Sequence, residues 1–377
     1  MPGPLQGLKV VEIASIGPGP FAVMMLADMG ANVIRLERAA GGTGGGTWNL
    51  TNRGRPSVAV DLKHPDAVEL TLSLCEEADV LVEGFRPGVM ERLGLGPDVV
   101  LARNPRLVYG RMTGYGQDGP LSSVAGHDIN YISIGGALGA MQRQGEKPMF
   151  PLNLVGDYGG GGMLLAFGVL AGVYEAQRSG QGQVVDAAMV EGTAVLTTIF
   201  HAMRAAGAWN DQPGTNWLDS GAPWYEVYET ADGKYFSVGA LEPQFHAKLL
   251  ELLELDDSEM GQFDMPKWRE HKQRLAAVFK TRTRDEWAAL LQPADACATP
   301  VLSFAEALEH PHNVARSVFV EHAGAVQPAP APRFSRTSPE LGVPPREPGA
   351  DTDQALAAWG ISAEHRSKLR DTGAIGS

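Results

Sequence analysis

Short apolar runs alternate with amphipathic segments over the first half of the chain. Six of these runs have the length and the Val, Ile and Leu content of buried strands, and they lie at 9–14, 32–37, 57–62, 79–83, 106–112 and 183–189. Segment 65–78 carries apolar residues at three- and four-residue spacing, and segment 20–30 opens on a proline and ends on a glycine, so both predict helices. Strands that alternate with helices predict a doubly wound α/β domain on a parallel sheet.

The second half of the chain shows a different pattern. Two long apolar helices are predicted at 159–178 and 191–206. Alternating apolar residues on both sides of an Asp-Gly pair at 232–233 then predict a hairpin, and helical segments follow over 243–291. The expected boundaries are a large α/β domain over 1–206, a linker over 207–223, a small α+β domain over 224–318, an extended proline-rich linker over 319–350 and a C-terminal helical segment over 351–377.

Composition narrows the class of protein. The chain has 377 residues, of which 44% are hydrophobic, enough for a sizeable core in more than one folding unit. A net charge of -13 disfavours nucleic acid as a partner, because nucleic-acid binding needs a basic surface. Cys75 and Cys297 are far apart in the sequence and predict buried free thiols in a reducing compartment. A glycine-rich stretch over 41–46 predicts a flexible loop.

The N-terminus and the longest apolar run bear on localisation. The first residues, MPGPLQGLKVVEIA, lack the basic, then apolar, then small-residue order of a signal peptide. The apolar run over 162–174 is shorter than a bilayer span and contains three glycines. We therefore expect a cytoplasmic protein without membrane insertion.

The turn after the first strand has the spacing of a dinucleotide-binding fingerprint. Residues 17–22 (GPGPFA) follow a strand and open a helix, and Glu37 lies about twenty residues further on. However, Pro18 and Pro20 lack the backbone N–H groups that would hold a pyrophosphate, and no later segment is typical of a hydride-transfer site. A tight turn into a helix is the favoured interpretation, and a nicotinamide-dependent dehydrogenase is the alternative.

Basic residues follow several of the predicted strands. They are Arg38, Arg53, Arg55, Lys63, Arg86 and Arg92. Open α/β sheets bind ligands at the carboxyl ends of their strands, and a cluster of cations there suits phosphate groups. For any one of these residues, solvated surface charge is an equally good interpretation, so the prediction of an anion site depends on the set.

Two polar turns in an otherwise apolar region offer groups that exchange protons. His127 lies in AGHDINY (125–131), and Asp157 lies in NLVGDYGGGG (153–162), directly before a long apolar segment. An imidazole and a carboxyl group of raised pKa are both suited to proton transfer near neutral pH. The alternatives are a buried core histidine and a plain helix N-cap. The cap role of Asp157 is compatible with a chemical role, and N–H groups at that helix start would hold a developing oxyanion.

A series of motifs along the chain resembles the family III CoA-transferases and, within them, the α-methylacyl-CoA racemases. The motifs of the first half are PLQGLKVVEIA (4–14), GPGPFAVMMLADMGANVIRLE (17–37), NRGRPSVAVDLK (52–63), DVLVEGFRPGVMERLGLG (79–96), GHDINY (126–131), NLVGDYGGGG (153–162) and GQGQVVDAAMVEG (180–192). Those of the second half are GAPWYEVYETADGKYFSVGALEPQF (221–245), DACATPVLSFAEAL (295–308) and APRFSRT (331–337). The resemblance therefore covers nearly the whole chain.

The resemblance implies a Rossmann-like large domain built from both chain ends, a smaller α+β domain, and two subunits interlinked like rings in a homodimer. It implies an acyl-CoA substrate, with coenzyme A as part of the substrate and no metal, flavin or nicotinamide cofactor. It places two catalytic bases on His127 and Asp157, a supporting residue from the partner subunit on Glu242, and a residue that supports the carboxylate on Asn153. The implied CoA-binding positions are Ile16, Arg38, Val60, Leu62, Lys63, Arg86, Arg92, Gly126 and Tyr131.

The implied reaction interconverts the R and S forms of 2-methylacyl-CoA thioesters through an enolate, with His127 on one face and Asp157 on the other. In the transferases of this family the residue that matches Asp157 is a covalent nucleophile, the matching histidine is absent, and the small domain usually carries a glycine-rich loop. His127 is present here and the segment around Glu242 has no such loop, so the racemase is favoured. The alternatives are CoA transfer between carboxylic acids with Asp157 as nucleophile, and an acyl-CoA-binding protein without enzymatic activity.

Overall fold

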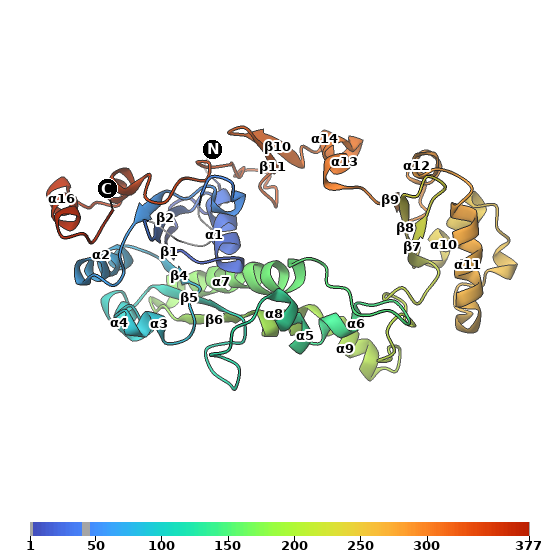
Figure 1. The fold of residues 1–377 in the computed structure, drawn as a ribbon, viewed down its shortest axis with the longest axis horizontal. Coiled ribbons are helices and arrows are strands. Elements are labelled where there is room, and N and C mark those ends of the chain that lie inside the picture. The colour runs from blue at the N-terminus through green and yellow to red at the C-terminus, as the bar shows by residue number, and fades with distance from the viewer. Residues whose placement is uncertain (1–2, 40–45, 377) are drawn as a thin grey trace. The chain divides into compact units, whose positions relative to one another are not determined.

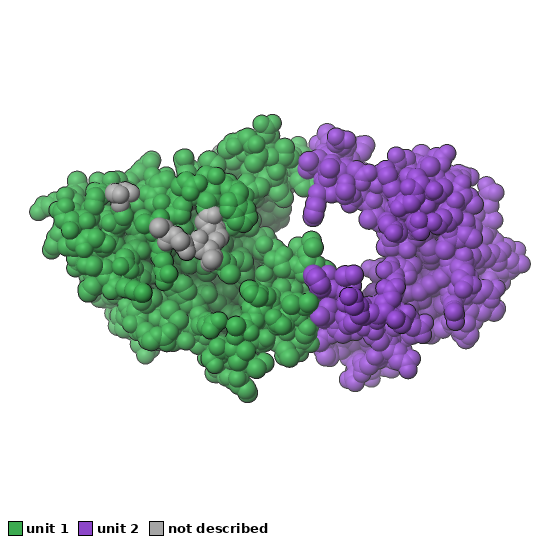
Figure 2. Space-filling model, in the orientation of Figure 1, with its two compact units in different colours: residues 1–135, 151–196, 317–377 green, residues 136–150, 197–316 purple. Residues whose placement is uncertain are grey.

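The computed structural model describes residues 3–39 and 46–376, so the predicted loop at 41–46 lies outside the described residues except for Gly46. The chain forms two compact units (Figures 1 and 2). The first comprises Met1–Gly135, Pro151–Leu196 and Ser317–Ser377, and the second comprises Gly136–Phe150 and Thr197–Arg316. Residues 136–150 and 197–206, which the sequence pattern grouped with the large domain, therefore lie in the second unit.

A six-stranded parallel sheet organises the first unit. Its strands are β1 (Lys9–Ile13), β2 (Asn32–Glu37), β3 (Ser57–Ala59), β4 (Val80–Glu83), β5 (Val108–Thr113) and β6 (Val184–Ala188). They lie in the order β3-β2-β1-β4-β5-β6, and every neighbouring pair is parallel. All six predicted strands are present, and the prediction of a doubly wound α/β fold is confirmed. The strand order reverses between β1 and β4, the place where such sheets bind ligands.

Helices cover both faces of this sheet (Figure 1). Successive residues of a strand point to opposite faces, so Val10 and Val11 of β1 belong to two different hydrophobic clusters. The Val10 cluster includes residues of α1 (Pro18–Asp28) and α7 (Leu164–Ser179). The Val11 cluster includes residues of α2 (Pro65–Glu76) and α4 (Pro97–Arg103) and of the C-terminal helices. Two shorter helical segments of this unit are α3 (Val89–Arg92) and η1 (Leu50–Asn52).

A π-helix, η2 (Leu154–Met163), runs directly into α7, so the helix begins earlier than the sequence pattern predicted. The continuous helix Leu154–Ser179 is long and apolar enough to cross a membrane by length and composition alone, unlike the shorter run at 162–174. Its residues Leu165 and Val169 are buried in the cluster against the sheet. Only 39% of the apolar window of this helix is buried, however, and Phe167 and Tyr174 of the same helix are exposed.

Glycines let η2 contact the next helix, α8 (Met189–Leu196), backbone against backbone. A Cβ added to Gly192 would lie 1.8 Å from the carbonyl oxygen of Gly160, and one added to Gly160 would lie 2.8 Å from the backbone nitrogen of Thr193. The predicted single helix at 191–206 is in fact two helices, α8 and α9 (Thr198–Ala205). The first belongs to the first unit and the second to the other.

The C-terminal segment packs on the edge of the sheet at β3. It forms α15 (Thr352–Ala358) and α16 (Ala363–Asp371) in place of the single predicted helix, and the turn between them includes Gly360 at φ +88. Beyond α16, the Asp61 N–H donates to the Ala374 oxygen at 3.0 Å. Ile375 is 3% exposed within the core. The preceding region, predicted as an extended linker, begins with a hairpin of β10 (Phe319–His322) and β11 (Ala325–Pro328).

The second unit is built around a three-stranded antiparallel sheet of β7 (Tyr225–Glu229), β8 (Tyr235–Gly239) and β9 (Ala298–Pro300). The predicted hairpin at 232–233 is therefore confirmed. The helical segments of this unit are α6 (Ala137–Ala140), α9, α10 (Pro243–Leu252), η3 (Asp257–Glu259), η4 (Met265–Lys267), α11 (Trp268–Phe279), α12 (Arg284–Leu291), α13 (Phe304–Glu309) and α14 (Pro311–Ala315). The prediction of two buried thiols is half right, because Cys75 is buried and Cys297 is exposed.

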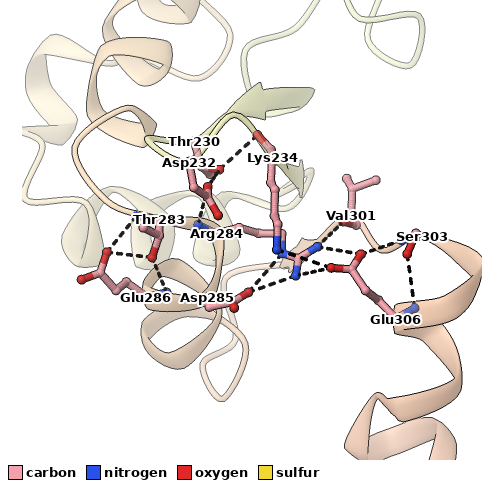
Figure 3. Close-up of polar contacts among 10 residues, drawn as sticks. All are labelled: Thr230, Asp232, Lys234, Thr283, Arg284, Asp285, Glu286, Val301, Ser303 and Glu306. Carbon is pink, nitrogen blue, oxygen red and sulfur yellow. Dashed lines mark hydrogen bonds and ion pairs between the residues drawn. The ribbon is translucent and has the colours of Figure 1, made fainter.

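A buried arginine joins the parts of the second unit that are distant in sequence (Figure 3). The Arg284 guanidinium at the start of α12 donates to both carboxylate oxygens of Glu306 in α13, at 2.8 and 3.0 Å. It also donates to the carbonyl oxygen of Val301 at 3.1 Å. The Glu306 carboxylate in turn accepts the N–H of Ser303, which caps α13. This network has a structural role, because each donor and acceptor connects elements of the fold.

Replacement of Ile375 tests whether the C-terminal segment belongs to the core. We expect Ile375→Ala to lower the free energy of unfolding by about 2–5 kcal/mol, because a buried aliphatic side chain is lost. Urea denaturation measures this change. Val124→Ala is the control, since this side chain is 50% exposed, and it is expected to change stability by about 0.5 kcal/mol or less. Equal effects of the two substitutions would contradict the assignment.

The close contact between η2 and α8 predicts strong sensitivity at Gly192. We expect Gly192→Ala to destabilise the protein by about 1–3 kcal/mol or more, because the added methyl group must push two backbones apart. Thermal unfolding measures the effect. Gly139→Ala is the matched control, since an added Cβ there meets nothing within 4 Å. A wild-type melting temperature for Gly192→Ala would contradict the close backbone contact.

Candidate active site

A cavity of about 590 Å³ lies at the carboxyl ends of β1, β2, β3 and β4. It is at the point where the strand order reverses, as expected for a ligand site in a doubly wound sheet. Five of the nine predicted CoA-binding positions line it, namely Ile16, Arg38, Val60, Leu62 and Lys63. Gly84 and Phe85, which follow β4, also line it. Segments distant in sequence meet here because parallel strands end at the same edge.

The predicted basic set divides into two groups. Arg38 and Lys63 are exposed and line the cavity, where they offer cations to a phosphate-bearing ligand. Arg86 follows β4 and Arg92 ends α3, and both are exposed near the same sheet edge. The second group consists of Arg53 and Arg55, and both are buried.

Arg53 and Arg55 do not belong to an anion site, and this part of the prediction is wrong. The Arg53 guanidinium forms an ion pair of 2.6 Å with Asp28, and that of Arg55 forms one of 3.1 Å with Glu12. Burial lowers the pKa of Arg55 to about 10. Both side chains are buried, and each is paired with a carboxylate. The pairing is needed because an unpaired charge inside the protein would lower its stability.

Buried charged residues on the strands form a layer beside the cavity. Arg35 and Glu37 of β2 line it, and their charged groups lie 3.3 Å apart. The Glu37 carboxylate also accepts the Ser57 hydroxyl at 2.6 Å. Glu37 therefore has a structural partner in place of the ribose that a dinucleotide fingerprint requires. The sequence signal for this layer was the presence of charged residues, such as Arg35 and Glu37, inside otherwise apolar strand segments.

The turn before α1 lies against the Asp157 carboxyl group. Gly17 adopts φ +70, a conformation that favours glycine, and the helix then starts at Pro18. A Cβ added to Gly17 would lie 3.4 Å from Oδ2 of Asp157. A pyrophosphate bound in this turn would face that carboxyl group, so the tight-turn interpretation fits the structure better than a dinucleotide site.

His127 immediately precedes α5 (Asp128–Ile134), and its side chain is exposed. Its backbone N–H donates to Oδ1 of Asn130 at 3.0 Å, which holds the start of this helix. The alternative of a buried core histidine is therefore wrong. The imidazole is accessible to a ligand.

Asp157 lies one turn inside η2, and Asn153 occupies the N-cap position. The prediction that Asp157 caps the helix is therefore wrong, because the π-helix begins before it. Its carboxylate accepts Nδ2 of Asn153 at 3.0 Å, and its backbone N–H donates to Oδ2 of Asp128 at 2.7 Å. This N–H is thus engaged by a side chain and is removed from the donors predicted for an enolate oxygen.

Burial raises the pKa of Asp157, the hydrogen bond from Asn153 opposes the rise, the charge of Asp128 adds to it, and His127 opposes it. The hydrogen bond from the Asp157 N–H to Asp128, the residue that follows His127, brings the two segments that carry the predicted bases together. An accessible imidazole beside a carboxyl group of raised pKa can move a proton between two faces of a bound molecule.

Tyr131 and Gly126, which do not line the cavity described above, contact each other beside His127 in the chain. The Tyr131 hydroxyl donates to the Gly126 carbonyl oxygen, and its ring meets that of Tyr115 edge to face at 5.0 Å. A Cβ at Gly126 would lie 2.8 Å from the Tyr131 ring, so only glycine fits. Burial raises the pKa of Tyr131 to about 12, so this hydroxyl stays neutral and serves as a donor.

Glu242 belongs to the second unit, where it is exposed at the N-cap position of α10. The first unit carries His127, Asp157, Asn153 and the cavity. Over residues 3–39 and 46–376, no group of three or more His, Cys, Asp or Glu side chains is arranged to hold a metal ion. The described site offers an imidazole and carboxyl groups, and cations line the cavity.

Comparison with known proteins places this geometry in a family. A mouse protein named alpha-methylacyl-CoA racemase is 46% identical over 97% of this chain and 96% of its own length, and the human protein of the same name is 42% identical over the same shares. A crystal structure of Rv3272 from Mycobacterium tuberculosis covers 93% of this chain and 99% of its own, with a TM-score of 0.78 and 27% identity. The model of CoA-transferase family III matches residues 5–353. The chain belongs to CoA-transferase family III.

Proposed function

We propose that this protein racemises 2-methylacyl-CoA thioesters by moving the α-proton between His127 and Asp157. The observation that carries the proposal is the hydrogen bond between Asp128 and the Asp157 backbone, which joins the segment of an exposed imidazole, His127, to a partly buried carboxyl group whose pKa is raised. The mouse and human relatives named for this activity match nearly the whole chain, and their names give the substrate class. Coenzyme A enters with the substrate, and the reaction needs no other cofactor.

The cavity at the sheet edge would bind the nucleotide part of the CoA thioester. Arg38 and Lys63 line it and supply positive charge for the phosphates, while Val60 and Leu62 supply apolar contacts for a base. Arg86 and Arg92 add exposed cations beyond β4. Gly126 and Tyr131 contact each other in the segment that carries His127, and the acyl end of the same ligand would pass this segment to reach the bases.

The reaction follows from the acidity of the proton next to a thioester carbonyl. One base removes this proton, an enolate forms, and the conjugate acid of the other base returns a proton to the opposite face. His127 acts as base on one enantiomer and Asp157 on the other, so their roles exchange with the direction of reaction. Burial raises the pKa of Asp157, which favours the protonated form that must donate. Asn153 holds the carboxyl group through its hydrogen bond.

CoA transfer is the runner-up activity, and it uses the same carboxyl group differently. Its oxygen would attack the thioester carbonyl, expel the CoA thiolate and leave an acyl–aspartyl anhydride. The presence of His127 favours racemisation, because an imidazole at this position supplies the second base that a two-faced proton transfer needs.

We also propose a homodimer in which Glu242 of each chain completes the site of the other. Glu242 is exposed and carried by the second unit, whereas both bases belong to the first. Exposed apolar side chains on the first unit, including Phe167 at 71% and Ile134 at 63%, offer a surface suited to association.

Exchange of the α-hydrogen with solvent tests the proton-transfer mechanism. In deuterated water, wild-type protein should exchange the α-hydrogen of R and S 2-methylacyl-CoA, and His127→Ala and Asp157→Asn should each slow racemisation by about 10²–10⁴-fold. Asp157→Asn should still fold, because this side chain does not cap the helix. Mass spectrometry measures exchange, and thermal unfolding checks the fold.

Two outcomes would contradict this mechanism. Undiminished exchange in both variants would exclude His127 and Asp157 as the bases. Trapping of an acyl-enzyme by hydroxylamine at Asp157, without solvent exchange, would favour the transferase.

Coexpression of two inactive variants tests the shared site. We expect a heterodimer of Glu242→Ala and His127→Ala chains, purified through two different tags, to recover about half of wild-type activity, because one of its two sites is intact. The homodimers of each variant are the controls. An inactive heterodimer would place Glu242 and His127 of one chain in the same site.

A further inference from the structure

Asp128 connects the two elements that carry the proposed bases. It directly follows His127 in the sequence and is the first residue of α5. Its side chain is 4% exposed, and Oδ2 accepts the backbone N–H of Asp157 at 2.7 Å. One short side chain thus fixes the distance between the backbone next to the imidazole and the backbone of the carboxyl residue.

The Asp157 N–H needs such an acceptor. In a π-helix each N–H bonds to the carbonyl five residues earlier, so the first N–H groups have no partner within the helix. Asp157 is the fourth residue of η2, and the N-cap residue Asn153 makes no side-chain capping bond. Asp128 therefore supplies from α5 the acceptor that η2 lacks.

The fit around the Asp128 carboxylate is tight and specific. A Cβ added to Gly156 would lie 2.6 Å from Oδ2, so the contact requires glycine at the position before Asp157. Oδ1 is buried and has no hydrogen-bond partner among the described residues. Burying a carboxylate with one unsatisfied oxygen costs stability.

We propose that Asp128 is a positioning residue, which holds the Asp157 carboxyl group in register with His127 through its bond to the Asp157 backbone. The proposal rests on the proposed function, because it assigns to Asp128 the geometry of that proton transfer. Asp128 does not act on the substrate. It acts through the π-helix backbone.

Charge gives the same residue a second, measurable effect on Asp157. The pKa of the Asp157 carboxyl group is affected by three neighbours, namely Asn153, Asp128 and His127. The charge of Asp157 in turn raises the pKa of Tyr131, and the charge of Arg86 lowers it. Burial raises the pKa of Asp157, and the Asp128 charge adds to the rise. When Asp157 is the base it must be ionised, so activity in that direction falls as pH drops through its pKa. Removal of the Asp128 charge should move this acidic limb to lower pH.

Two substitutions separate position from charge. Asp128→Asn keeps an oxygen that can accept the Asp157 N–H but removes the charge, whereas Asp128→Ala removes both. The assay is racemisation of R and S 2-methylacyl-CoA in deuterated water, with kcat and KM determined across pH for each direction. Asp79→Ala is the matched control, because Oδ2 of Asp79 accepts the Lys9 N–H at 2.8 Å at the amino end of the sheet. Thermal unfolding accompanies every variant.

We expect Asp128→Ala to lower kcat by about 10²-fold with little change in KM, as for a misplaced catalytic group. Asp128→Asn should stay within about tenfold of wild-type kcat, because the hydrogen bond is retained. Both should show the acidic limb at lower pH in the direction that uses Asp157 as base. Asp79→Ala should match the wild type in kcat and in pH profile.

The proposal is overturned if folded Asp128→Ala keeps wild-type kcat, or if Asp128→Asn loses as much kcat as Asp128→Ala with no shift of the limb. In the second case Asp128 would have a structural role only. If the wild-type protein itself shows no exchange of the α-hydrogen, the proposed function is overturned, and this inference with it. That outcome is distinguished from the others because it is observed before any substitution is made.

Discussion

The close backbone packing of the π-helix is the constraint on which the site depends. Gly160 of η2 meets Gly192 of α8, and Gly156 meets the Asp128 side chain, with no room for a Cβ at these glycines. On another side, a Cβ on Gly162 would lie 2.6 Å from the Phe21 ring of α1. Helices that approach this closely have little freedom to shift. The position of Asp157 is therefore set by close contacts of the η2 backbone with α1, α5 and α8.

In this acidic protein, buried cations are paired with carboxylates, whereas the cations at the strand ends are exposed. Arg53 and Arg55 are buried and paired with Asp28 and Glu12, so their charges are neutralised within the fold. Oε2 of Glu12 is buried without a partner among the described residues, and burial raises the pKa of this carboxyl group. Exposed cations, in contrast, remain where the strands end. A net negative protein can thus present a local positive surface to a phosphorylated ligand.

One carboxyl group suits two reactions, and its surroundings favour one of them. A nucleophilic carboxylate is most effective when ionised, whereas a two-base proton transfer needs a carboxyl group that also exists as the acid. Burial and the Asp128 charge shift Asp157 toward the acid, and His127 provides the second base. The presence of His127 and the raised pKa of Asp157 thus agree with the sequence similarity to racemases, because both suit a two-base proton transfer.

The sequence by itself determined the local elements and, through them, much of the site. Strand patterns predicted all six parallel strands, and strands of one sheet end at one edge, so Arg38 and Lys63 could be expected to meet. Only the tertiary structure decided that Arg53 and Arg55 are buried, that Asp157 lies inside a π-helix, and that Asp128 bonds to it. The physical reason is separation along the chain. Periodicity within a segment shows which of its faces is buried, whereas the partners of Arg53, Arg55 and Asp157 lie 25 to 43 residues away and contact them only after the segments pack.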